Sequence, residues 1–143
     1  MRVIGLDIGE VRTGVAVSDR DAKVANPITV LETKRMLADP KPLRDLVIEE
    51  DAGQLVVGLP LTMAGEEGPQ ALRVRELGDR LGDLLGIPVA YIDERLSSAE
   101  ASRVMTAAGR SVKQQRGTLD MVVAALLLQS WLDRHSTAEE NDD

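Results

Sequence analysis

The chain of 143 residues has no cysteine, and its aromatic side chains are limited to Tyr91 and Trp131. Without cysteine there is no disulfide, no thiol nucleophile and no cysteine-ligated metal, and this composition suits a reducing cytoplasm. The scarcity of aromatic residues removes the stacking platforms on which many single-strand binders depend. The core therefore has to be packed by Leu, Val, Ile and Ala.

Histidine and long apolar runs are also scarce. The single histidine, His135, lies near the C-terminal end, so acid–base catalysis by histidine is not expected. No apolar run approaches the length that crosses a bilayer, and the first residues read as a strand rather than a signal peptide. We expect a cytoplasmic protein without a membrane partner.

The formal net charge is −7, which argues against a protein that coats nucleic acid without specificity. Residues 137–143 carry four acids and no base, so the rest of the chain has −7 + 4 = −3. We expect one domain over residues 1–135, followed by an acidic and disordered tail over 136–143. A local basic patch is still compatible with this charge.

Hydrophobic patterns and turn residues predict the order of the elements. Three strands come first, and then a helix, a strand, a helix, a strand and two helices alternate with polar turns. The helix before residue 109 begins with a capping box, and the last helix is almost wholly apolar from Met121 to Leu128. The predicted strands are 3–8, 13–18, 27–31, 54–60 and 88–92, and the helices begin near 40, 71, 97 and 118.

This order predicts an α/β fold with a five-stranded mixed sheet. The first three strands have short connections and should pair antiparallel, whereas the last two are separated by a helix and should run parallel with right-handed crossovers. Helices are then expected on both faces of the sheet. Ligands bind such sheets at the carboxyl ends of the parallel strands.

Three acids stand where polar side chains are least expected: Asp7 within the first strand, Glu94 at the end of the last strand, and Asp120 at the start of the most apolar helix. Each has a structural alternative: Asp7 as a turn cap, Glu94 in an ion pair, and Asp120 as a partner of the helix dipole. Together they fit one geometry, in which two strand ends and a helix start meet at one sheet edge.

Clustered carboxylates stay ionised together only when a cation offsets their repulsion. Oxygen ligands without His or Cys favour Mg²⁺ or Mn²⁺, and two such ions can activate water and stabilise the leaving oxygen of a phosphodiester. Asp93 competes with Glu94 for this site, because neighbouring strand residues face opposite sides. The sequence leaves that choice open.

Five ordered motifs resemble the YqgF/RuvX family of bacterial RNase H-like nucleases. They are residues 5–9 (GLDIG), 12–19 (RTGVAVSD), 57–60 (VGLP), 93–98 (DERLSS) and 120–125 (DMVVAA). The resemblance implies an RNase H-like fold and two-metal phosphodiester hydrolysis at Asp7, Glu94 and Asp120. It departs from the family at Val11, where Lys is frequent, at Thr62, where Asn is frequent, and at Ser97 and Ser98, where two threonines are usual.

The same resemblance implies two substrates, precursor 16S ribosomal RNA at its 5′ end and the Holliday junction. We expect structured RNA, since junction cleavage needs a stable dimer and the sequence shows no dimer signal, which predicts a monomer or weak homodimer. The basic linker 110–117 supplies candidate phosphate contacts. The predicted substrate-binding residues are Arg12, Arg95, Arg110, Lys113 and Arg116.

Two other functions compete with the nuclease. The Asp7–Gly9 turn also resembles the phosphate loop of actin-like ATPases, but those proteins need two such domains. A non-catalytic regulator that binds nucleic acid is favoured by the acidic charge and opposed by the three carboxylates. Metal-dependent hydrolysis by the purified protein would separate the nuclease from the non-catalytic regulator.

Overall fold

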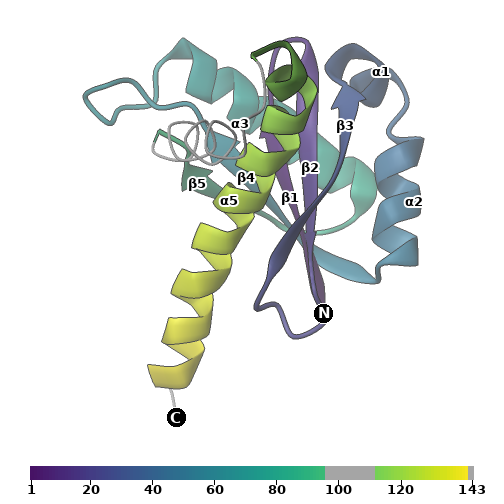
Figure 1. Ribbon diagram of the computed structural model, residues 1–143, viewed down its shortest axis with the longest axis vertical. Coiled ribbons are helices and arrows are strands. Elements are labelled where there is room, and N and C mark those ends of the chain that lie inside the picture. Colours follow the sequence, from purple (N-terminus) through teal and green to yellow (C-terminus); the bar gives the residue numbers. More distant parts are fainter. Residues whose placement is uncertain (96–111, 142–143) are drawn as a thin grey trace.

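The computed structural model describes residues 1–95 and 112–141 (Figure 1). Five strands form one mixed sheet in the order β3-β2-β1-β4-β5, with β1 antiparallel to β2, β2 antiparallel to β3, and β4 parallel to both β1 and β5. This topology confirms the predicted sheet. The strands are β1 (Arg2–Ile8), β2 (Arg12–Ser18), β3 (Ala25–Glu32), β4 (Ala52–Leu59) and β5 (Val89–Asp93).

Helices cover both faces of the sheet, as predicted. On one face, α2 (Lys41–Glu49) and α3 (Pro69–Leu85) pack against β1 residues such as Ile4 and Leu6. On the other face, α5 (Val112–Asn141) crosses the sheet and packs against Val3 (Figure 1). Because β1 side chains alternate between the faces, Asp7 shares the α5 face with Val3.

The last helix differs from its predicted limits. It begins at Val112 rather than at Thr118, so most of the predicted basic linker is helical backbone. Gly117 and the polar residues before it carry no apolar periodicity, and packing of the following turns against the sheet overrides that weak local signal. The helix also continues to Asn141, which differs from the predicted disordered tail, and Ala and Glu favour such a continuation. The domain boundary after residue 135 stays a prediction.

A short helix, α1 (Thr33–Ala38), follows β3 and is not among the predicted elements. It is held by two buried residues, Met36 in the core and Thr33 at the first turn. The Thr33 hydroxyl donates to the carbonyl of Gly9 at 2.8 Å and lies 2.9 Å from the Thr13 hydroxyl. These contacts fix the β1–β2 turn beside α1.

Glycine lets α5 approach the sheet closely over the carboxyl end of β1. Gly14 in β2 pairs with Asp7 in β1, and a Cβ atom at Gly14 would collide with the backbone carbonyl of Asp120. A larger residue at Gly14 would therefore push α5 away from the sheet. No helix in the described ranges 1–95 and 112–141 is long and apolar enough to span a membrane.

Candidate active site

Asp7 and Glu94 meet at the carboxyl ends of two strands that are not neighbours. β1 and β5 both pair with β4, so they lie about 10 Å apart at the usual strand spacing. Gly58 of β4 lies between them and has no side chain, and a Cβ atom there would come 2.8 Å from Glu94 Oε2. The missing side chain leaves the space in which Asp7 and Glu94 share a hydrogen bond.

The environment of this pair raises the pKa of both carboxyl groups. Burial raises the pKa of Asp7 to about 6, the hydrogen bond from Glu94 works against this shift, and the charge of Asp120 adds to it. For Glu94, burial and then the charge and hydrogen bond of Asp7 raise the pKa to about 8. Near neutral pH, Glu94 therefore holds a proton that it donates to the Asp7 carboxylate.

Asp120 lies on the α5 face close enough for its charge to act on Asp7. Its Oδ2 atom accepts a hydrogen bond from Arg12 Nε at 2.8 Å, and the two side chains are 24% and 44% exposed. Because α5 begins at Val112, Asp120 is not in the first turn, and the helix-dipole explanation of this acid is wrong. Its position instead depends on the close approach of α5 at Gly14.

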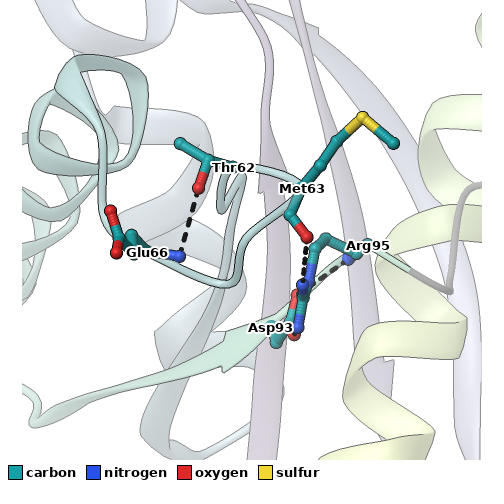
Figure 2. A network of polar contacts seen from close by, with 5 residues as sticks. All are labelled: Thr62, Met63, Glu66, Asp93 and Arg95. Atoms are coloured by element: carbon teal, nitrogen blue, oxygen red, sulfur yellow. Dashed lines mark hydrogen bonds and ion pairs between the residues drawn. The ribbon is translucent and has the colours of Figure 1, made fainter.

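Asp93 and Glu94 have different partners in the structure. Asp93 is exposed and forms an ion pair with Arg95, whose Nη2 atom lies 2.7 Å from Asp93 Oδ2 (Figure 2). Hydrogen bonds and charge from Arg95 lower the pKa of Asp93. Glu94, one residue later, is the acid that reaches Asp7. Of the two acids, Glu94 is therefore the one that the structure places against Asp7.

Arg95 also connects the strand end to the loop after β4 (Figure 2). Its Nη1 atom donates to the carbonyl oxygen of Met63 at 3.4 Å, and the Met63 side chain is fully exposed. Within the same loop, the backbone N–H of Glu66 donates to the Thr62 hydroxyl at 3.2 Å. The loop after β4 thus has an internal hydrogen bond and an anchor beside Glu94.

The five predicted substrate cations have different surroundings. Arg12 and Arg95 both lie next to the acids, and both are already paired with a carboxylate. Lys113 and Arg116 lie in α5, and the structure describes their backbone but not their side chains. Arg110 and the capping box predicted at Ser97 are outside the described residues.

The donor set of the three acids suits a hard divalent cation. Asp7 and Glu94 are half-buried carboxyls in direct contact, and burial and then the charge of neighbouring acids raise their pKa values. Carboxylate oxygens of this kind are the ligands that hard divalent cations take. Asp120 is hydrogen-bonded to Arg12 instead. Among residues 1–95 and 112–141, no group of three or more Asp, Glu, His or Cys side chains is arranged to hold a metal ion. Ligation by all three acids would require Asp120 to exchange its arginine partner.

The spacer Gly58 is the site residue that sequence reasoning missed. Its signal was present in the Gly58-Leu59-Pro60 motif, but a strand glycine has several explanations. Only the strand order shows that Gly58 separates the two strands that carry the acids.

Comparisons with known proteins support the fold. The chain is similar to RuvC of Thermus thermophilus in complex with a Holliday junction substrate, with a TM-score of 0.59 at 16% identity over 95% of this chain and 96% of that one. It is also similar to the fowlpox virus resolvase bound to Holliday junction DNA, with a TM-score of 0.55 at 10% identity over 94% and 98% of the two chains. At these identities the likeness shows a shared RNase H-like fold.

Sequence relatives are much closer. A protein of Anaeromyxobacter sp. (strain K) is 41% identical over 95% of this chain and 99% of its own length, and one of Thermosynechococcus vestitus is 40% identical over 94% and 89%. Both carry the name "Putative pre-16S rRNA nuclease". The family model described as "RuvX: Holliday junction resolvase" matches residues 1–134. The chain therefore belongs to the RuvX family of nucleases, as its motifs predict.

Proposed function

We propose that this protein hydrolyses phosphodiester bonds with the help of divalent metal ions, in the cytoplasm, at the 5′ end of precursor 16S ribosomal RNA. The observation that carries the proposal is the contact between Asp7 and Glu94, two acids with raised pKa values at the carboxyl ends of parallel strands. Asp120 adds a third carboxylate from α5. Structural acids are usually paired with cations, whereas these two are paired with each other.

Mg²⁺ or Mn²⁺ would be held by Asp7, Glu94 and Asp120. The chemistry that such ions supply is activation of water and stabilisation of the leaving oxygen of the phosphodiester. The chain contributes the arrangement of the oxygen donors. Binding a cation requires Glu94 to lose the proton that it shares with Asp7, so metal affinity should rise with pH.

Arg12 is the residue that links this site to the substrate. Its side chain is 44% exposed, and its Nε atom donates to Asp120, so the positive charge lies at the edge where a phosphate would bind. If Asp120 turns toward a metal, the guanidinium becomes available for a phosphate oxygen, a ligand that Arg binds well. Arg12 thus neutralises Asp120 in the absence of metal and binds substrate in its presence.

The names of the sequence relatives favour RNA as the substrate. The relatives that are about 40% identical over nearly the whole chain carry the RNA-processing name, whereas the junction complexes are similar only in fold. The description of the matching family supports junction cleavage as the second candidate. A junction resolvase makes paired cuts and needs a stable dimer, while a monomer can trim an RNA end.

Both substrates should be offered to the purified protein at the same salt and metal concentration, with its mass measured in solution. We expect Mg²⁺- or Mn²⁺-dependent cleavage of precursor 16S RNA near its 5′ end and no cleavage with chelator. Symmetric cuts in a four-way junction by a stable dimer, with the RNA untouched, would establish the second candidate. Binding of either substrate without cleavage by any divalent metal would leave a regulator as the function.

A further inference from the structure

A cavity lies on the α5 side of the sheet, at the end opposite to the three acids. Its volume is about 370 Å³, and it lies between α5, the start of β1 and the turn from β2 to β3. Trp131 and His135, the only tryptophan and the only histidine of the chain, line it together with Arg20 and Lys23. Neither aromatic residue takes part in the candidate active site.

Trp131 and His135 form a stacked pair one turn apart on α5. Their ring centroids are 3.7 Å apart with an interplanar angle of 22°, and His135 Nδ1 lies 2.8 Å from the carbonyl oxygen of Trp131. Trp131 packs on the α5-side core, whereas His135 is exposed. A fixed aromatic surface therefore faces the solvent beside the cavity.

The turn that carries Arg20 and Lys23 is held in place by side-chain hydrogen bonds. Asp19 Oδ1 accepts from the backbone N–H groups of Lys23 at 2.8 Å and Val24 at 3.1 Å. From α5, Gln129 Nε2 donates to the carbonyl of Lys23 at 2.8 Å. The hydrogen bond from Gln129 thus holds the turn at a fixed position relative to the aromatic pair on α5.

The two cations of this turn form no short ion pair with a described acid, although the charge of Lys23 acts on Asp19 nearby. Arg20 and Lys23 are exposed, and neither has an ion pair with any acid in the described part of the chain. Asp21 also lines the cavity and offers an acceptor for the amino group of a base. A flat aromatic surface, two cations and one acceptor match the base and phosphates of an unpaired nucleotide better than they match an apolar ligand.

We propose that this cavity is a second nucleic-acid contact, which takes an unpaired nucleotide of the substrate. The base stacks on the exposed face of His135, and the adjacent phosphates lie against Arg20 and Lys23. This inference rests on the proposed function, because the bound strand is part of the RNA that reaches the acids. His135 follows Asp120 by 135 − 120 = 15 residues of one helix, or about 22 Å, which a few nucleotides of single strand can span.

The test uses Trp131 as the only tryptophan reporter. A single-stranded RNA of about twelve nucleotides, long enough for one such site, is titrated into the protein with chelator present, so that no cleavage occurs. We expect quenching of Trp131 fluorescence. The double variant Arg20→Ala/Lys23→Ala should bind about tenfold more weakly, and its salt slope should fall by about 1.4, since each single-strand phosphate contact contributes about 0.7.

Two further variants separate the site from general electrostatics. Arg44→Ala/Arg80→Ala removes the same charge from exposed positions of α2 and α3, on the other face, and should leave the affinity unchanged. His135→Ala should weaken binding by about fivefold or more through lost stacking. Melting curves check that each variant is folded.

The inference is overturned if the RNA leaves Trp131 fluorescence unchanged, or if both double variants lose affinity equally. It fails alone if the protein cleaves precursor RNA with metal while Arg20→Ala/Lys23→Ala binds normally. The proposed function fails alone if metal never gives cleavage, while quenching and its loss in Arg20→Ala/Lys23→Ala are observed as expected.

Discussion

Asp93 and Glu94 are adjacent in the chain but have opposite electrostatic environments. Asp93 is exposed beside Arg95, which lowers its pKa, whereas Glu94 is half-buried against Asp7, and its pKa rises to about 8. The alternation of side chains at the end of β5 sends one acid to each side of the sheet. The partner on each side, a cation or a second acid, then determines the charge state.

The contrast separates a structural acid from a candidate ligand. Asp93 has its cation built into the protein, so it has no need of an external one. The Asp7–Glu94 pair has no cation of its own in the described structure, and only a shared proton relieves its repulsion. Asp93 and Glu94 can therefore be distinguished by testing which of the two carboxyl groups is needed for the effect of a metal ion.

The largest effect is expected from Asp7→Asn, with Asp93→Asn as its matched control. Asp7→Asn should lower cleavage by about a thousandfold or more, about 4 kcal/mol of barrier at about 1.36 kcal/mol per factor of ten, because it removes a metal ligand. Asp93→Asn should retain most of the activity. Single-turnover rates on precursor RNA measure both, and equal loss in the two variants would contradict the assignment.

The next effect concerns the space between the two acids. In Gly58→Ala, the new Cβ atom would lie 2.6 Å from Leu127 Cδ1 and 2.8 Å from Glu94 Oε2. We expect Glu94 to move away from Asp7, with a loss of activity and an overpacking cost of about 1–3 kcal/mol in the free energy of unfolding. Urea unfolding and cleavage rates test both expectations.

Gly68→Ala is a suitable control for this substitution. Gly68 has extended backbone angles, and its Cβ atom would meet only Thr62 Cγ2 at 3.1 Å. Because Gly68 is the N-cap of α3, where Ala is less favourable, the variant should lose a little stability but remain active. If Gly58→Ala also keeps its activity and stability, the contact between Asp7 and Glu94 does not depend on the missing side chain at position 58.

A third expectation is a pH-dependent stability of the metal-free protein. Folding raises the pKa of Asp7 from 3.8 to about 6 and that of Glu94 from 4.5 to about 8, so the folded state binds protons more tightly than the unfolded state. This stabilisation is complete below the unfolded pKa values and is lost as pH rises through the folded ones. The free energy of unfolding should therefore fall between about pH 4 and pH 8 by at least about 1 kcal/mol.

Chemical denaturation across this pH range, with chelator and with Mg²⁺, provides the measurement. Mg²⁺ should restore stability most strongly at the upper end, where both acids are ionised. Asp7→Asn/Glu94→Gln should flatten the metal-free curve and abolish the restoration. A double variant with the wild-type pH curve would show that other groups cause the dependence.

The sequence predicts most of the sheet and the convergence of the three acids, because strand periodicity and connection lengths are local signals. It does not predict the Gly58 spacer or the Arg12–Asp120 pair, which depend on strand order and on how closely α5 approaches β2. The helical start at Val112 was also missed, since packing rather than periodicity supports those turns. Tertiary contacts thus decide the details on which the chemistry depends.

The smallest effect is expected from Arg95, which the sequence predicts as a substrate contact. In the structure Arg95 is occupied by Asp93 and the Met63 carbonyl, so it fixes the loop after β4 to the strand end that carries Glu94. A positioning role predicts that Arg95→Ala lowers kcat modestly with KM unchanged, and that the pKa of Asp93 returns toward its ordinary value in NMR titration. A phosphate contact predicts a raised KM with kcat unchanged. Asp93→Asn removes the same anchor, so the double variant should be no worse than Arg95→Ala alone, and an additive loss would show that the two residues act separately.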